Sequence, residues 1–119
     1  MNVENLLPFL EVTFNVSETI TLLKREGFRF FSWGCDKIIA VESTEKDKYG
    51  TMAKGLLLHV NGHHHKGFCL ITLNGNDTYT FRLLNNQLNQ KGETVTDVYF
   101  DELFDRIDKL IEYIPAYNR

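Results

Sequence analysis

The chain has 119 residues, of which 43% are hydrophobic and 13% aromatic, and it carries a formal net charge of −3. This length suits one domain that buries on the order of two-thirds of its unfolded surface, and the composition excludes a disordered chain. Basic residues form no stripe along the sequence, which disfavours electrostatically driven nucleic-acid binding.

The start of the chain predicts one helix after an ambiguous lead-in. Val3–Phe14 combines helical and strand-like spacings, and we expect a short helix or an irregular segment that covers the core. Ser17 is a suitable N-cap residue, and Gly27 suits the position just past a helix end. The sequence therefore predicts a helix over residues 17–26.

Two strands and a loop are expected next. Phe28–Trp33 and Lys37–Glu42 are strand-like in composition and flank a turn at Gly34-Cys35-Asp36. Ser43–Lys54 is polar and charged and contains Gly50, which favours a loop.

Asn61-Gly62 marks the clearest turn, between the strand-like segments Gly55–Val60 and His63–Leu73. Asn-Gly is the strongest short-range hairpin signal, because both residues tolerate the positive φ of a two-residue type I′ turn. In that register residue 60 faces residue 63, and residue 59 faces residue 64. One face then carries Leu56, Leu58, Val60, Cys69, Ile71 and Leu73. The other face carries Leu57, His59, His64, Lys66, Phe68 and Leu70.

Apolar residues occupy both faces of Gly67–Leu73, as in a central strand that is covered on two sides. Two helices alone could leave one face of a five-stranded sheet open, and a homodimer would then supply the missing cover. Alternatively, the N-terminal segment and the long loops cover that face. The sequence leaves both explanations open.

The second half of the chain predicts a turn, a strand, a loop and a helix. Asn74–Asp77 is a strong turn cluster, and Thr78–Leu84 alternates like a half-buried strand. The amide-rich segment Asn85–Glu93 is predicted to be a surface loop. Thr96 or Asp97 then caps a helix that Pro115 ends. Its apolar stripe has 3- and 4-residue spacing and consists of Leu103, Phe104, Ile107, Leu110, Ile111 and Ile114.

These elements follow the order helix, about five strands, helix. Short links between consecutive strands favour an antiparallel meander. The expected fold is a single α+β domain over residues 1–119. It has a mainly antiparallel sheet of four to six strands, with an N-terminal helix and a C-terminal amphipathic helix packed on it.

All four histidines lie in the predicted hairpin, where His59 and His64 are direct cross-strand neighbours with β-carbons about 5 Å apart. Two imidazoles so placed could share a transition metal such as zinc. His63 and His65 point toward the other face. A zinc site needs three or four protein ligands, and no local residue completes the pair. A solvated, histidine-rich tip is the simpler interpretation.

Acidic residues gather near the C-terminus, where residues 97–112 hold six acids against two bases. Those at helical spacing are Asp101, Asp105, Asp108 and Glu112. Such a face could dock a basic protein or bind a divalent cation, although it is more often the hydrated side of an amphipathic helix. It is a candidate interaction surface.

Other chemistry has less support. Cys35 lies beside Asp36, which opposes a reactive thiolate, and Cys69 alternates with core residues. The aromatic run within Phe28–Trp33 could stack on bases, but few basic residues accompany it. The sequence has no Walker motif and no G-x-G-x-x-G motif.

Cysteine usage and the lack of signal-peptide or membrane-spanning patterns lead us to expect a cytoplasmic protein without a membrane partner. The leading hypothesis is a non-catalytic protein that binds a protein partner or itself, through the acidic helix face or an exposed strand edge. The alternative is a metal-binding protein or metal-dependent enzyme centred on His59 and His64. A nucleic-acid accessory factor is the third hypothesis. No motif indicates a family.

Overall fold

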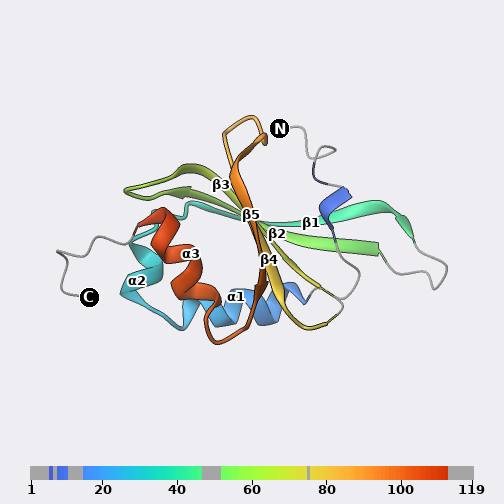
Figure 1. The fold of residues 1–119 in the computed structure, drawn as a ribbon, viewed down its shortest axis with the longest axis horizontal. Coiled ribbons are helices and arrows are strands. Elements are labelled where there is room, and N and C mark those ends of the chain that lie inside the picture. Colours follow the sequence, from blue (N-terminus) through green and yellow to red (C-terminus); the bar gives the residue numbers. More distant parts are fainter. Residues whose placement is uncertain (1–5, 7, 11–14, 47–51, 75, 113–119) are drawn as a thin grey trace.

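A computed structural model describes residues 6, 8–10, 15–46, 52–74 and 76–112 of the chain. The elements in these residues are α1 (Val16–Lys24), α2 (Phe28–Phe31), β1 (Lys37–Lys46), β2 (Met52–Asn61), β3 (Lys66–Leu73), β4 (Tyr79–Leu84), β5 (Gln90–Val98) and α3 (Leu103–Ile111). Neighbouring strands pair antiparallel in the order β1-β2-β3-β4-β5 (Figure 1). The predicted α+β fold with a meander sheet is confirmed. No helix in the described part of the chain is long and apolar enough to cross a membrane.

One predicted strand is a helix. Phe28–Phe31 forms the single turn of α2 between Gly27 and Gly34, whose φ angles of 60° and 62° lie in the left-handed region that favours glycine. Helical spacing brings Phe30 and Trp33 to the same side of the turn. Phe30 packs against the core and Trp33 is fully buried. Burial of these two rings therefore outweighs the strand preference of an aromatic segment.

The fifth strand is β5, which overlaps the predicted loop Asn85–Glu93. Nearly all side chains of β5 are exposed, so no apolar alternation marks the strand in the sequence. Its pairing with β4 has an irregular register. The turn before β5 is stabilised by Asn85, whose side-chain oxygen accepts hydrogen bonds from the N–H groups of Gln87 and Asn89.

The N-terminal helix begins one residue earlier than predicted. Ser17 lies inside α1, and the N-cap is Asn15. The Asn15 side chain accepts a hydrogen bond from the N–H of Glu18 at 3.0 Å, which satisfies one free donor of the first turn. The helix ends at Lys24, so the predicted range of 17–26 is correct to within two residues.

The C-terminal helix begins later than predicted, because Thr96 and Asp97 belong to β5 and the N-cap of α3 is Glu102. Four stripe residues are buried as predicted: Leu103, Phe104, Ile107 and Ile111. Leu110 is 44% exposed and therefore lies off the buried stripe. The predicted helix end at Ile114 and Pro115 lies outside the described residues.

The first hairpin is longer than predicted, and the second turn matches its prediction. Ser43–Lys54 was predicted to be a loop, but β1 continues to residue 46 and β2 starts at residue 52. Residues 47–51 lie outside the described part of the chain. Between β3 and β4, the N–H of Asn74 donates to the carbonyl of Thr78 at 2.7 Å, and Asp77 has a φ of 65°.

The β2–β3 hairpin has a wider tip than predicted. Asn61 pairs with Lys66, so four residues form the connection, and neither Asn61 nor Gly62 has the positive φ of a type I′ turn. The predicted two-residue turn is therefore wrong. Every pairing is displaced by four residues, and Leu58 lies opposite Cys69. Because four is an even number and side chains alternate with a period of two, each residue of β2 and β3 keeps its predicted face. His63, His64 and His65 lie in the connection and so have no strand face.

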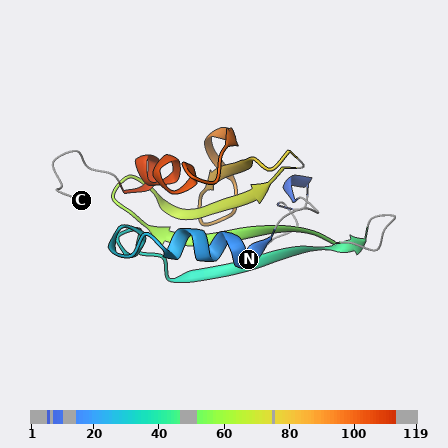
Figure 2. The same cartoon turned by 90° about the horizontal axis from the view of Figure 1, so that it is seen from below.

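Apolar side chains cover both faces of the sheet. On the helix face, the strand residues Leu56, Leu58, Val60, Cys69 and Ile71 pack in one cluster with Leu23, Trp33 and the buried stripe of α3. On the other face, Leu57, Phe68, Leu70 and Leu84 pack with Leu6, Leu10 and Leu88. The helices gather toward one end of the molecule, and the short turn at residues 8–10 lies toward the other (Figures 1 and 2). Leu6 and Leu10 near the N-terminus and Leu88 in the β4–β5 turn thus supply the second cover.

Candidate functional site

His59 and His64 do not face each other. His59 lies on β2 opposite Phe68, and the centroids of the two rings are 4.7 Å apart. His64 lies in the hairpin connection, where its backbone N–H donates to the carbonyl of Ile111 at 2.7 Å. The cross-strand pair is therefore wrong, because the tip is four residues wide. Metal binding by His59 and His64 stays a prediction, but the cross-strand pairing on which it was based is not present.

Two other side chains hold the ring of His59. Its Nδ1 lies 2.6 Å from Asp36 Oδ1, and its Nε2 lies 3.2 Å from Asn86 Oδ1. The hydrogen bond with His59 lowers the pKa of the exposed Asp36 carboxyl. Among the described residues, no group of three or more histidine, cysteine, aspartate or glutamate side chains is arranged to hold a metal ion.

His63 connects the hairpin tip to the end of α3, and His65 is held within the hairpin. The backbone N–H of His63 donates to the carboxylate of Glu112 after the end of α3. The His65 side chain is 4% exposed, and its Nε2 lies 3.0 Å from the carbonyl oxygen of Phe68. Burial lowers the pKa of His65, so its ring is neutral at pH 7.

The predicted acidic surface is partly internal. Asp108 is 1% exposed, so its placement on an exposed face is wrong. One carboxylate oxygen of Asp108 accepts a hydrogen bond from Trp33 Nε1 at 2.8 Å, and the other lies 3.8 Å from the Arg29 guanidinium. A buried indole N–H requires an acceptor, and Asp108 provides it from the neighbouring helix.

The remaining members of that acidic set have different environments. Asp101 and Asp105 are exposed, and Asp105 forms an ion pair with Arg29. Glu112 is half-buried against the N–H of His63. Asp105 and Glu112 therefore link α3 to α2 and to the hairpin tip. Docking of a basic partner on this face stays a prediction.

Neither cysteine is in an environment that activates a thiol. The thiol of Cys35 donates to the carbonyl of Lys37 at 3.4 Å, and burial raises the Cys35 pKa. Cys69 is fully buried, which also raises its pKa. Both thiols are protonated at neutral pH, whereas a nucleophilic cysteine needs a lowered pKa.

The most exposed large apolar side chains in the described part of the chain are on α2. Phe28 is 92% exposed and Phe31 is 82% exposed. They are three residues apart and so lie on one face of the helical turn. A hollow of about 590 Å³ adjoins Phe31. Its lining consists of Lys24, Gly27, Phe30, Phe31, Gly34, Cys35 and Asp36.

The opposite side of α2 is anchored to α3. The ring of Trp33 stacks on Phe104, with centroids 4.5 Å apart and planes 10° apart. The guanidinium of Arg29 lies 4.9 Å from the centroid of the same Phe104 ring and also pairs with Glu26. Phe30 packs edge-on against Trp33. The exposed rings of α2 are thus carried by a well-fixed turn.

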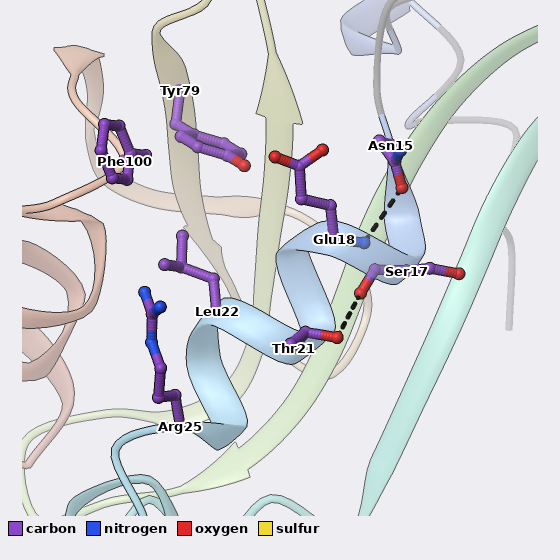
Figure 3. Close-up of a pocket in the computed structure, with 8 residues that line it drawn as sticks. All are labelled: Asn15, Ser17, Glu18, Thr21, Leu22, Arg25, Tyr79 and Phe100. Carbon is purple, nitrogen blue, oxygen red and sulfur yellow. Dashed lines mark hydrogen bonds between the residues drawn. The ribbon is translucent and has the colours of Figure 1, made fainter.

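A second hollow of about 450 Å³ lies between α1 and the segment that links β5 to α3 (Figure 3). On α1, Glu18, Leu22 and Arg25 share one helical face at i, i+4 and i+7 spacing. Tyr79 and Phe100 lie across from them in Figure 3. The lining is completed by Asn15, Ser17 and Thr21.

The two hollows were not identified as sites from the sequence. The α2 surface, formed by Phe28, Phe31 and the adjoining hollow, was not predicted because residues 28–33 were expected to be extended. The spacing of Glu18, Leu22 and Arg25 was visible within a predicted helix, but nothing marked Phe100 as its neighbour. Comparisons with protein-family models, curated proteins and solved structures found no match.

Proposed function

We propose that this chain is a non-catalytic protein-binding domain, with Phe28 and Phe31 at the centre of its contact surface. The proposal is carried by the exposure of both rings, 92% and 82%, on one face of α2. A single exposed apolar residue needs no explanation. Two adjacent aromatic rings beside a hollow are typical of a protein contact, because water exclusion from such rings favours association.

The anchoring of α2 supports this proposal. Trp33 and Arg29 connect the turn to Asp108 and to the ring of Phe104. A contact surface that is already ordered loses less conformational entropy when it binds. Phe28 and Phe31 would therefore act as preorganised anchor residues.

The hollow next to Phe31 indicates the chemistry of the partner. Phe30 and Phe31 contribute aromatic surface to it, which suits an apolar side chain. Lys24 and Asp36 also line it and provide one charge of each sign. We expect a partner segment with an apolar residue flanked by an acidic and a basic residue, since complementary rim charges fix orientation.

The test replaces both rings in a Phe28→Ser/Phe31→Ser variant. A partner captured by the wild-type chain from its own cells is purified, and its dissociation constant is measured by calorimetry. We expect the double variant to bind at least about tenfold more weakly, because aromatic hot spots contribute about 2 kcal/mol or more. Leu110→Ser, which removes an apolar side chain that is 44% exposed on α3, is the control.

The control is expected to bind with wild-type affinity. Circular dichroism of both variants should match the wild type, because neither change touches a buried side chain. Wild-type affinity in the double variant would refute the proposal, and so would an equal loss in Leu110→Ser.

A further inference from the structure

We infer that two copies of this chain contact each other through the hollow along α1, with their α1 helices antiparallel. This hollow, lined by Glu18, Leu22, Arg25 and Phe100 among others, is called the α1 groove below. This surface is distinct from the α2 surface, and the inference does not depend on the proposed function. It rests on the order of side chains along α1 and on the hollow of about 450 Å³ beside them.

The charges on the groove face of α1 are complementary to those of a second α1 that runs in the opposite direction. Glu18 is near the N-terminal end, Arg25 follows the C-terminal end, and Leu22 lies between them. The backbone positions of residues 18 and 25 are about 10 Å apart along the axis, at 1.5 Å per residue. A two-fold axis beside Leu22 would place each Glu18 opposite the Arg25 of the other copy, with the two Leu22 side chains in contact. An isologous dimer requires this kind of pattern.

Both charged side chains are available for such a contact. Glu18 and Arg25 are exposed, and within the described residues neither forms an ion pair. Glu26, by contrast, is already paired with Arg29. The carboxylate of Glu18 and the guanidinium of Arg25 lie on either side of Leu22 in the groove (Figure 3).

The walls of the groove suit a second helix. Phe100 is 64% exposed and faces α1 across the hollow. The hydroxyl of Thr21 donates to the carbonyl of Ser17 at 3.0 Å, so it needs no partner from the other copy. Packed helices lie 8–10 Å apart. Ser17 and Thr21 are small side chains in the lining of the groove, so they leave room for a second helix at this distance. The second α1 would cover Leu22 and Phe100.

Charge reversal tests the dimer. Glu18→Arg places two cations opposite each other, and Arg25→Glu places two anions opposite each other. We expect light scattering after size exclusion at low salt to report a wild-type dimer. The dimer dissociation constant of each single variant should rise at least about tenfold, because like charges across a contact repel. Added salt should weaken the wild-type dimer.

Mixing the two single variants is the decisive arm. In a mixed dimer both charge pairs are again opposite in sign, so an equimolar mixture should form a heterodimer. The Glu18→Arg/Arg25→Glu double variant should also recover the wild-type dimer. Lys24→Glu is the matched control, since it reverses a charge in the same last turn and has a similar effect on the helix dipole.

The outcomes separate this contact from the α2 surface. The Phe28→Ser/Phe31→Ser variant should remain a dimer. Its conversion to a monomer would place the contact on α2 and overturn the inference. A wild-type monomer at every concentration, or a mixture of the single variants that stays monomeric while circular dichroism reports folded protein, would also overturn it.

Discussion

At the scale of single residues, Asp108 illustrates how a partner can reverse an expectation of exposure. Its helical spacing with Asp101 and Asp105 predicts a hydrated position. The structure buries it, because Trp33 brings an indole N–H into the core and that donor needs an acceptor. A buried carboxylate is costly unless it is hydrogen-bonded and paired. Arg29 and Trp33 meet both needs and fix α2 against α3.

His65 makes stability depend on pH. Burial lowers its folded-state pKa below the ordinary value of 6.5, and Lys91 acts in the same direction. Backbone hydrogen bonds to Phe68 and Leu84 oppose this shift. As the pH falls through about 6.5, the unfolded chain takes up a proton before the folded chain does. The stability that neutral His65 contributes is therefore fully present above about pH 6.5 and is lost as the pH falls further.

We expect the free energy of unfolding of the wild type to fall between about pH 7 and pH 5 by more than that of His65→Gln, as measured by urea denaturation. The substitution removes the titrating ring from the buried position. His63→Gln, which changes an exposed ring in the same connection, should keep the wild-type slope. Identical pH slopes for the wild type and His65→Gln would contradict the assignment.

At the scale of elements, the β2–β3 tip shows tertiary contact overriding local turn preference. Asn61-Gly62 favours the tightest hairpin, yet the connection is four residues wide. The tip lies against the end of α3, where the N–H of His64 donates to the carbonyl of Ile111. Gly62 makes the closest approach. A β-carbon there would lie 2.4 Å from Ile111 Cγ2 and 2.5 Å from the Ile111 carbonyl oxygen.

Gly62→Ala should therefore destabilise the fold by about 1–3 kcal/mol, because a methyl group cannot fit without moving the tip away from α3. Urea unfolding measures the difference. His64→Ala keeps the backbone N–H that donates to Ile111, and it should change stability by less than about 0.5 kcal/mol. Wild-type stability of Gly62→Ala would show that the contact between the tip and α3 is not important.

The elements differ in how well the sequence predicts them. α1, β3, β4 and the buried stripe of α3 carry strong local patterns, and their predictions were correct to within a few residues, apart from the start of α3. α2 was mistaken for a strand, since Phe28–Phe31 satisfies strand composition. β5 was missed because its exposed side chains carry no alternation. For α2 the missing information is its packing against α3, a distant segment. For β5 it is backbone pairing with the neighbouring strand β4, which leaves no pattern in exposed side chains.

At the scale of the whole molecule, the two faces of the sheet are covered by different kinds of structure. Three helices pack on one face. The other face is covered by Leu6 and Leu10 near the N-terminus and by Leu88 in the β4–β5 turn. A second copy of the chain is thus not needed to bury β3. The dimer that we infer rests on α1 instead.

The N-terminal cover should contribute strongly to stability. Leu6 is fully buried against the second face of the sheet. We expect Leu6→Ala to lower the free energy of unfolding by about 2–5 kcal/mol, through lost burial and a residual cavity. Phe28→Ala removes a larger side chain that is 92% exposed, and it should cost less than about 0.5 kcal/mol in the same urea titration. Equal losses in the two variants would contradict this assignment of the core.

Local patterns along the chain were sufficient for the fold class, the meander order and the face on which each residue of β2 and β3 lies. The faces survived the wrong turn because side chains alternate with a period of two and the register moved by four. The candidate sites were much less accessible. The separation of His59 from His64, the burial of Asp108 and the exposure of Phe28 and Phe31 all depend on the packing of α2 and α3. Periodicity reports which side of an element is apolar, whereas only packing between distant elements determines which side chains meet and which remain exposed.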